Sequence, residues 1–299
     1  MLKREFKEIP IATRTIIVSS NTTINIENLY KNLPITEYNV VKKKRGRKKK
    51  NLVESINNTV ESGSIISIKY QDLLRGVELK PKKPNKKFFR NAVTIIMSID
   101  NKFINLKISK NGKFQVTGCK KFEHCKTAII NLFSIIIKDI KNYLYTYEDN
   151  INILFNNVMT NKDFSMGFQV KREELDYIIN NDTSHNSLLE TSFGYTGINL
   201  KMHLNTSISR NFSCMRINIH TGKVEDYIMD YNNYLTKLTD KEKEKETKRR
   251  HVTFLIFQSG NVIMSGMNEG IMEHYYKEFY KIIENNIEQI KEHISPPVL

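Results

Sequence analysis

The sequence predicts an α+β fold of two tandem pseudo-repeats, whose antiparallel strands form one curved sheet with long helices on a single face. Two segments carry this prediction, Phe103–Gly118 and Val252–Gly266. Each runs as a strand, a glycine-containing turn and a second strand before a long helical stretch. Apolar and polar residues alternate along these strands, which is typical of strands with one buried face. A pattern that returns along the chain indicates an internal repeat.

A long amphipathic helix is expected after each hairpin, near residues 122–145 and 270–293. Apolar residues recur there every three or four positions, so each helix presents an apolar stripe to the sheet. The stripes contain Cys125, Ile129, Leu132, Ile136 and Ile140 in the first helix, and Met272, Tyr276, Phe279, Ile283 and Ile290 in the second. The sheet face that these helices leave uncovered is available for a ligand.

Two earlier pieces extend the repeat. Thr13–Leu33 corresponds to Asn161–Asn181, because both read as a strand that leads into a helix. Phe88–Ile99 is matched with Asn211–Ile219, because in both an aromatic residue precedes a strand. The common unit is therefore a strand, a helix, several antiparallel strands and a long helix.

These correspondences divide the chain into two repeats. The first is expected at residues 1–150, with a basic insertion at about 40–87 that holds an extra strand at residues 64–70. The second is expected at residues 151–299, with a charged insertion at about 230–250. Runs of like charge between strands are typical of surface insertions.

The chain has 299 residues and a formal net charge of +15. Such an excess of cations favours a polyanionic partner, because side chains that neutralise phosphates release the counterions bound to them. The alternative is a lysine-rich surface that only maintains solubility, since the chain is rich in Lys, Asn and Ile. Charge alone leaves both interpretations open.

Neither a membrane span nor secretion is expected. No apolar stretch approaches the roughly 18–20 residues of a transmembrane helix. The first ten residues, MLKREFKEIP, carry charges where a signal peptide is apolar. The three cysteines, Cys119, Cys125 and Cys214, lack the paired spacing of a zinc site. We therefore expect an intracellular protein with no metal and no other cofactor.

The second hairpin, LIFQSGNVIMSG at Leu255–Gly266, resembles the strand, turn and strand of the TATA-box-binding protein family. The resemblance covers most of the chain apart from the two insertions. It implies a saddle-shaped sheet whose concave face lies in a widened minor groove of AT-rich DNA, with phenylalanines wedged between base steps. With its large insertions and its excess of Asn, Lys and Ile, the chain resembles a divergent member of the family from a large DNA virus.

Carried over position by position, the resemblance implies three wedge residues, Phe89 or its neighbour Phe88 in the first repeat and Phe212 and Phe257 in the second. The fourth wedge position falls on Ser109. The alternative register would turn Lys107 toward the helices, and burying an unpaired lysine costs several kcal/mol. The first repeat is therefore expected to have lost one wedge.

The resemblance also implies a set of groove-facing residues that read A·T base pairs. A·T pairs present only acceptors in the minor groove, whereas G·C adds the donor of the guanine 2-amino group. Either Asn157 or Asn161 falls where the family has an asparagine that donates to bases. The sequence does not fix the register of this strand, so both stay candidates. The expected set is Thr13, Gln115, Thr117, Asn157, Asn161, Ile263 and Ser265.

Phosphate contacts are expected mainly in the first repeat. Lys113 and Lys120 match family lysines that contact phosphate, whereas Asn261 and Asn268 stand at those places in the second repeat. Lys107 adds a cation on the groove face. The first repeat is thus expected to supply electrostatic attraction and the second to supply the wedges.

A basic run, Lys42–Lys50, adds Arg45 and Arg47 to the expected phosphate contacts. Its sequence, KKKRGRKKK, fits an arm on phosphates, an RGR element in an AT-rich minor groove, or a nuclear-import signal. A solvated insertion with no specific role is the alternative.

These observations predict a DNA-binding transcription initiation factor that is not an enzyme. Its expected partners are AT-rich promoter DNA, other initiation factors and RNA polymerase, with no membrane. It is expected in the host nucleus, a cytoplasmic viral factory or the virion. One alternative is a protein-interaction module of the same fold. Another is a base-flipping, glycosylase-like enzyme, which needs an acid in a pocket of the concave face. The groove-facing residues expected above include no carboxylate.

Overall fold

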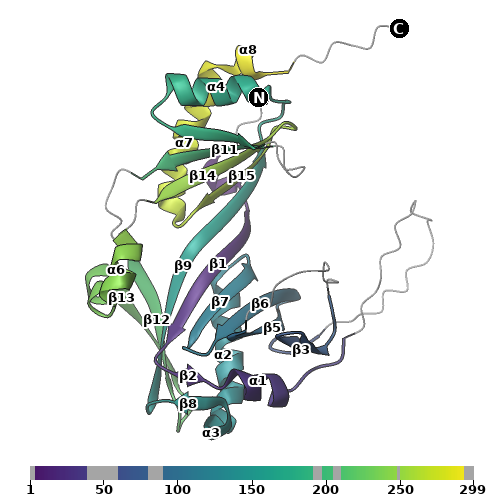
Figure 1. Ribbon diagram of the computed structural model, residues 1–299, viewed down its shortest axis with the longest axis vertical. Coiled ribbons are helices and arrows are strands. Elements are labelled where there is room, and N and C mark those ends of the chain that lie inside the picture. Colours follow the sequence, from purple (N-terminus) through teal and green to yellow (C-terminus); the bar gives the residue numbers. More distant parts are fainter. Residues whose placement is uncertain are drawn as a thin grey trace, which may run out of the picture. The chain divides into compact units, whose positions relative to one another are not determined.

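The computed structural model describes residues 4–38, 60–79, 90–190, 197–204, 210–247 and 250–292 of the chain. The described residues form two compact units (Figure 1). The α2 unit, named after its long helix, comprises residues 15–156 and 212–228. The α7 unit comprises residues 1–14, 157–211 and 229–299. The repeats were predicted to divide at residue 150. In the structure the two units divide between Asn156 and Asn157, within one long strand.

The α2 unit is a sheet with helices packed against one face. In chain order its main elements are β1 (Ile11–Ser20), α1 (Ile26–Asn32), β3 (Ile65–Tyr70), β4 (Leu73–Gly76), β5 (Ala92–Ile99), β6 (Lys102–Ser109), β7 (Lys113–Cys119) and α2 (Phe122–Lys138). The strands follow the order β1-β7-β6-β5-β3-β4 across the sheet. The unit also contains a short pair, β2 (Thr23–Ile24) with β8 (Leu144–Thr146), the helix α3 (Ile140–Tyr143) and the strands within residues 212–228 that are described below.

The core of the α2 unit lies between α2 and one face of this sheet. Ile95, Leu106 and Val116 lie side by side on β5, β6 and β7, and all are fully buried. Four of the five residues predicted for the first helical stripe, Cys125, Ile129, Leu132 and Ile136, are buried against them. Each large aliphatic side chain removed from water in this way stabilises the fold by roughly 1.5–3 kcal/mol.

The α7 unit contains the second set of elements. They are η1 (Phe6–Glu8), β9 (Asn150–Ser165), α4 (Arg172–Asp182), β10 (Asn186–Glu190), β11 (Gly197–His203), α5 (Tyr231–Thr236), α6 (Asp240–Thr247), β14 (His251–Phe257), β15 (Asn261–Gly266), α7 (Glu269–Asn285) and α8 (Ile287–Ile290). The strands follow the order β10-β11-β14-β15-β9. β1 and β9 each contribute residues to both units.

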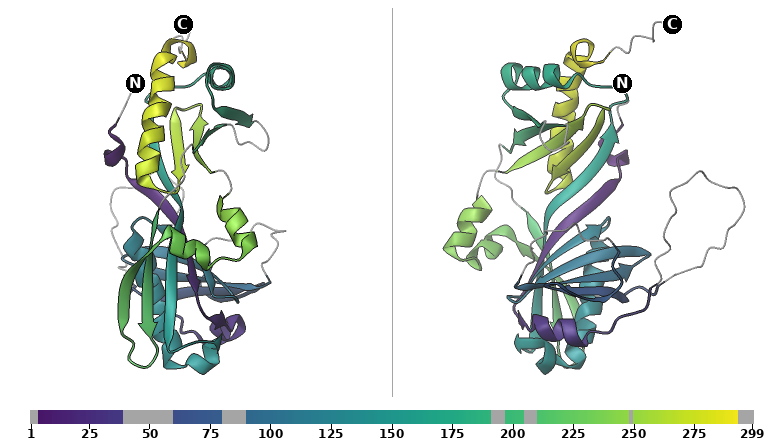
Figure 2. Two further views of the ribbon diagram at one scale, coloured as in Figure 1. Left: turned by 90° about the vertical axis from the view of Figure 1, so that its left-hand side faces the viewer. Right: turned by 45° about the vertical axis from the view of Figure 1, so that its right-hand side comes forward.

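The core of the α7 unit lies between α7 and its strands, which run alongside one another in Figure 2. Phe254 on β14 stacks on Phe279 of α7 at a ring distance of 4.5 Å. All five residues predicted for the second helical stripe are buried. The N-terminal segment joins this core, because the ring of Phe6 lies 5.5 Å from that of Tyr276.

The two units repeat one order of elements, which confirms the predicted α+β fold and internal repeat. β1, α1, β3, β5, β6, β7 and α2 correspond in turn to β9, α4, β10, β11, β14, β15 and α7. The strand orders β3-β5-β6-β7-β1 and β10-β11-β14-β15-β9 match as well. A strand is present where one was predicted at residues 64–70, but it is not an extra strand of an insertion, because β3 pairs with β5 and is the counterpart of β10.

Two turn glycines fix the detailed correspondence between the units. Gly112 and Gly260 have φ angles of 71° and 79°, in the left-handed region that residues with a Cβ rarely adopt. The carbonyl of Gly112 accepts from the backbone N–H of Ser20, and that of Gly260 accepts from Met166, both at 2.9 Å. Ser20 therefore corresponds to Met166, and the rest of β1 and β9 follows from this pair.

The expected match between Phe88–Ile99 and Asn211–Ile219 is wrong. The second segment forms β12 (Asn211–Asn218), which pairs with the first part of β9 and with β13 (Val224–Asp230). β11 takes the place of β5, because it lies between β10 and β14. The insertion of the second repeat therefore runs from His203 to His251 and not from about 230 to 250. An aromatic residue before an amphipathic strand describes β12 as well as β5, and only strand pairing separates them.

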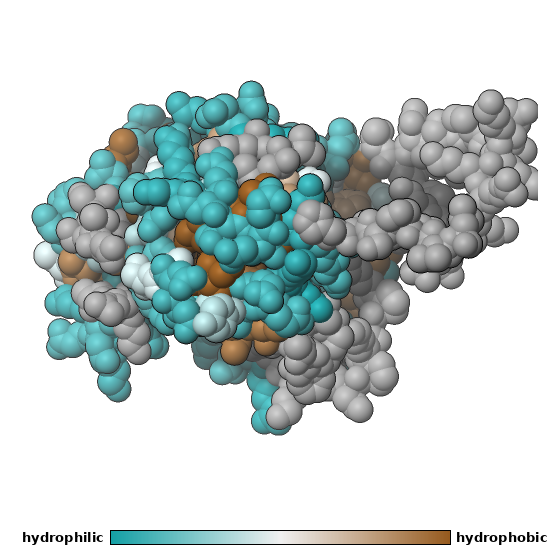
Figure 3. Space-filling view, turned by 90° about the horizontal axis from the view of Figure 1, so that it is seen from above, coloured by the Kyte–Doolittle hydropathy of each residue, from teal (hydrophilic) through white to brown (hydrophobic). Residues whose placement is uncertain are grey.

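The described surface is largely hydrophilic in the view of Figure 3, with smaller hydrophobic areas between. Among the described helices none is long and apolar enough to cross a membrane. Within the same residues, no group of three or more His, Cys, Asp and Glu is placed to hold a metal ion. All three cysteines are buried thiols.

Candidate nucleic-acid interface

Each unit has an open face, which is the sheet face opposite its helix-packed core. In the α7 unit Leu255 and Phe257 of β14 lie on this face, as do Ile263 and Ser265 of β15. Their strand neighbours are buried in the core, as the alternation of the two strands requires. The predicted strand phase of Phe257, Ile263 and Ser265 is therefore confirmed.

A central row of side chains crosses the open face of the α7 unit. Cross-strand pairing joins Leu188 to Asn199, Asn199 to Leu255, Leu255 to Ile263, and Ile263 to Asp163. Leu188, at the outer end of the row, is 64% exposed. The row is thus mainly apolar and ends in a carboxylate. Asp163 was not among the predicted residues, although Asn161, two positions before it, was predicted on the same strand face.

A second row lies beside it, made of Lys201, Thr253, Ser265 and Asn161. The side-chain oxygens of Asn161 and Asn199 are buried and have no hydrogen-bond partner among the described residues. Side-chain amides can present either an oxygen or an NH₂ group to a ligand, since the two ends have similar shape. The α7 unit therefore offers hydrogen-bonding amides within an apolar surface.

The central row of the α2 unit has a different character. It contains Lys69, Thr94, Lys107 and Gln115, joined by cross-strand pairs. Burial lowers the pKa of Lys107 from its usual value, because the half-buried ammonium is partly removed from water. Thr117 lies in the neighbouring row with Asn105 and Ile96. The predicted shared face of Lys107, Gln115 and Thr117 is confirmed.

Because Gly112 corresponds to Gly260 and Ser20 to Met166, each residue of one central row has a counterpart in the other. Lys69, Lys107, Gln115 and Ile17 of the α2 unit correspond to Leu188, Leu255, Ile263 and Asp163 of the α7 unit. Ser109 corresponds to Phe257, as the sequence predicted. Thr13 was expected to be the counterpart of Asn161 in the first repeat. The counterpart is Thr15, two residues further along β1. The hydrogen bonds of Ser20 and Met166 supply this correction.

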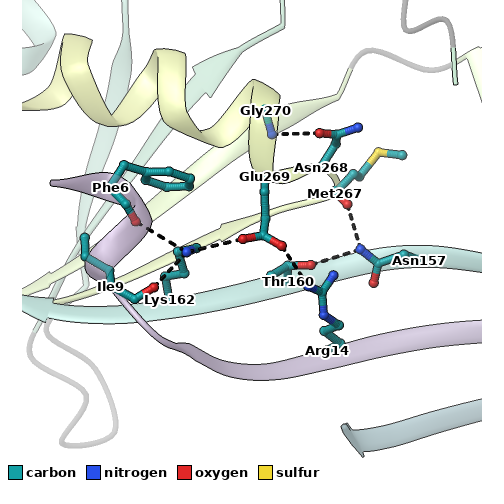
Figure 4. Close-up of polar contacts among 10 residues, drawn as sticks. All are labelled: Phe6, Ile9, Arg14, Asn157, Thr160, Lys162, Met267, Asn268, Glu269 and Gly270. Carbon is teal, nitrogen blue, oxygen red and sulfur yellow. Dashed lines mark hydrogen bonds and ion pairs between the residues drawn. The ribbon is translucent and has the colours of Figure 1, made fainter. Parts of the chain in front are cut away.

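The hydrogen bonds of Asn157 separate it from Asn161. Its side-chain NH₂ donates to the carbonyl of Met267 at 2.8 Å and to the hydroxyl of Thr160 at 2.9 Å (Figure 4). Both donor hydrogens are therefore used within the protein, and a carbonyl partner fixes the orientation of the amide. Asn161, which lies opposite Ser265 on the open face, remains the candidate for donating to a base.

The contacts of Lys162 and Glu269 in Figure 4 anchor the N-terminal segment within the α7 unit. The ammonium of Lys162 is 3% exposed and donates to the carbonyl of Ile9 at 2.7 Å. It also lies 3.3 Å from Glu269, whose other oxygen accepts from Arg14 at 2.7 Å. A buried ammonium requires such partners, because its desolvation otherwise costs several kcal/mol. Lys162 is thus a structural residue on the core side of β9.

The predicted phosphate-contact positions differ between the units. Lys113 and Lys120 are exposed at the two ends of β7. At the place of Lys120 the α7 unit has Asn268, whose side chain accepts from the backbone N–H of Gly270 and caps α7. Such a cap stabilises a helix by about 1 kcal/mol. Asn268 therefore has a structural contact at the position where the α2 unit has a lysine.

The structure places Phe212 differently from its expected role. Its side chain is 3% exposed in β12, and β12 is not the counterpart of β5. The strand that is the counterpart, β11, follows the sequence SFGYT, in which Phe193 stands four residues before Gly197. Phe88 stands likewise four residues before Ala92, where β5 begins. The alternation of Ile198, Leu200 and Met202 was the signal that could have led to Phe193.

Several predicted residues lie outside the described residues, namely Arg45, Arg47 and Phe89, and so does Phe193. Their DNA contacts stay predictions.

Comparisons with known proteins were made for the whole chain. No protein-family model matches it. A protein named uncharacterized protein 335L, from Invertebrate iridescent virus 6, is 26% identical over 201 residues, which is 65% of this chain and 60% of that protein. A protein named TATA-box-binding protein-like, from Acanthamoeba polyphaga mimivirus, is 25% identical over 302 aligned positions, covering 95% of this chain and 67% of that protein. This similarity confirms the predicted resemblance to TATA-box-binding proteins.

Among solved structures, that of Methanococcus jannaschii TBP matches with a TM-score of 0.46 and 14% sequence identity. The match covers 93% of this chain and 99% of that one. The first of the two viral relatives is longer than the matched segment, since this chain spans 60% of its length.

Proposed function

We propose that the chain binds AT-rich double-stranded DNA in the minor groove through the open faces of its two units, bends it, and acts in transcription initiation without being an enzyme. One observation carries the proposal. Each repeat has a sheet face opposite its helices that bears apolar, hydroxyl, amide and ammonium groups. Similarity to the mimivirus protein that is named TATA-box-binding protein-like supports the same role.

The chemistry of these rows suits the floor of an A·T minor groove. Adenine N3 and thymine O2 are acceptors, so the ammonium of Lys107 and the amides of Gln115 and Asn161 can donate to them. Leu255 and Ile263 provide an apolar surface for the sugar and base edges. Phe257, half-buried on the same face, is the described candidate for a wedge that opens a base step.

The partners follow from this role. A net charge of +15 favours a polyanion, which supports DNA over a partner protein of similar charge. Other initiation factors and RNA polymerase would then be met at the promoter. The site of action would be the host nucleus or a cytoplasmic viral factory.

Fluorescence anisotropy with labelled duplexes tests the proposal. We expect tighter binding to a duplex with a TATA element than to a G·C-rich duplex of equal length, at both low and moderate salt. Equal affinities with equal salt dependence would show phosphate attraction alone. No affinity for either duplex would favour a protein-interaction module.

The base-flipping alternative gains one residue from the structure, because Asp163 places a carboxylate on an open face. A glycosylase, however, holds its acid in a pocket that receives the extruded base. The carboxylate of Asp163 is exposed on the surface of β9. Incubation with duplexes that contain damaged bases should leave no abasic sites, and cleavage at such sites would restore the enzymatic alternative.

A further inference from the structure

Asp163 is the one acidic residue in the two rows that cross the open face of the α7 unit. Its side chain is exposed on β9, and it lies opposite Ile263 in the central row. In the part of the chain that the structure describes, no hydrogen bond or ion pair involves its carboxylate. Its neighbours along β9 on this face are Asn161 and Ser165, which are uncharged.

A carboxylate can only accept hydrogen bonds at neutral pH. In the minor groove, A·T pairs present acceptors alone, so a carboxylate on the groove floor is repelled by each of them. A G·C pair adds the 2-amino group of guanine, which is a donor at the centre of the groove. One kind of base pair can therefore satisfy Asp163 directly.

We propose that Asp163 is a specificity-determining residue that selects a G·C base pair at one position of an otherwise AT-rich site. It does so by accepting a hydrogen bond from the guanine 2-amino group. The inference rests on the proposed function, because it requires that the open face of the α7 unit lies in a minor groove.

The corresponding position of the α2 unit carries Ile17, which is half-buried and apolar. An aliphatic side chain suits an A·T pair and is hindered by the protruding guanine amino group. The two units therefore prefer different base pairs at equivalent positions. A site with G·C in one half only would fix which unit occupies which half, and so the direction in which the protein faces along the duplex.

Selection from a duplex library with an AT-rich centre and each position randomised in turn tests the inference. We expect the wild type to enrich G·C about tenfold at one position, in the range of single base-pair effects in specific complexes. Asp163→Asn should lose this preference, because an amide tolerates both kinds of pair, and Asp163→Ile should replace it with A·T. Asp182→Asn, which removes the same charge from an exposed residue of α4, is the matched control and should keep the wild-type profile.

The outcomes separate the inference from the proposed function. If the wild type binds AT-rich duplexes and Asp163→Asn has the same base profile, the inference is wrong and the proposed function stands. If Asp163→Asn and Asp182→Asn both raise affinity equally for every sequence, Asp163 only repels phosphates and the inference is again wrong. If the wild type binds no duplex, both fail. Circular dichroism melting of each variant establishes that it is folded.

Orientation gives a second, independent readout. The three native cysteines are buried, so a dye can be attached at Tyr177→Cys on α4, where the native side chain is 63% exposed. On a site with one G·C pair, the labelled protein that keeps Asp163 should transfer more energy to an acceptor at one duplex end than to an acceptor at the other end. Asp163→Ile should equalise the two. Equal transfer with Asp163 intact would overturn the inference.

Discussion

The α2 and α7 units share one order of strands and helices but use their open faces in opposite ways. The central row of the α2 unit has Lys69 and Lys107 where the α7 unit has Leu188 and Leu255. On the core side both units keep buried aliphatic and aromatic residues at matching positions. Close packing constrains a buried face to shape and volume, whereas a face left for a ligand can diverge in charge. Under the proposed function, we therefore expect the two units to contribute differently to DNA binding.

The largest expected effect is on salt dependence and concerns the basic run that follows α1. Deleting Lys42–Lys50 removes eight cations. Each phosphate contact contributes about 0.9 to the slope of log affinity against log salt, so the slope should flatten by several units if the run lies on DNA. The unfolding midpoint should stay unchanged, because a run of like charges cannot bury itself. Salt titration of anisotropy measures the slope, and an equally steep slope would show that the run touches no phosphate.

The next prediction concerns stability and the anchor of the α7 unit. Glu269→Ala leaves the ammonium of Lys162 buried without its carboxylate, and the α2 unit has the apolar Ile16 at the corresponding place. We expect a loss of about 3 kcal/mol in the free energy of unfolding, at the low end for a broken buried pair, because Glu269 is itself 40% exposed. Urea unfolding measures the loss.

The control for this variant is Glu288→Ala on the next helix, α8, where the side chain is exposed; it should change the free energy of unfolding by less than about 0.5 kcal/mol as a surface substitution. Equal losses in the two variants would show that Lys162 does not depend on Glu269.

A third prediction separates bending from attraction. Phe257→Ala should reduce the bend of a bound duplex sharply and leave most of the salt-dependent affinity, because unstacking a base step needs an apolar side chain in its place. Lys113→Ala with Lys120→Ala should keep the bend and lower the salt slope by roughly 1.8. Energy transfer between the duplex ends, combined with salt titration, measures both. A proportional loss of bend and affinity in both variants would refute a division of labour between the units.

The smallest expected effect is a pH dependence at Lys107. Burial lowers its pKa, so between the folded and unfolded pKa values the unfolded chain binds more protons. Stability should therefore rise slightly as the pH increases through that window, since the penalty of a half-buried charge is relieved. Lys107→Met should remove this rise. Thermal melting of both proteins between pH 8 and about 10.5, the usual lysine pKa, measures it. A rise that persists in Lys107→Met would assign it to another group.

The sequence predicted the elements whose pattern is set by local burial. The alternation of Ile104, Leu106 and Ile108 identified β6 and its faces, because a period of two is imposed by the sheet itself. The stripes of α2 and α7 were found for the equivalent reason. Phe257, Ser109 and Lys107 were consequently placed on the correct face before the structure was known.

The rest depends on long-range pairing that no local pattern contains. β12 was mistaken for the counterpart of β5, because both are amphipathic strands that follow an aromatic residue. The row of the open face in which Asp163 lies is set by its pairing with Ile263, a residue 100 positions away. Lys162 was not expected in the core, since lysine is rarely buried unless its partners are known. Those partners, Ile9 and Glu269, are remote in the sequence.

The anchor around Lys162 also has a consequence for the order of events during synthesis. Phe6 packs on Tyr276, and the carbonyl of Ile9 accepts from Lys162, which pairs with Glu269. Tyr276 and Glu269 are translated more than 250 residues after Phe6 and Ile9. At about 5–20 residues per second this is a delay of tens of seconds. Throughout it Phe6 and Ile9 lack their complete site, whereas β5, β6, β7 and α2 can already pair and pack. Closure of the α7 unit therefore has to wait until α7 has been translated.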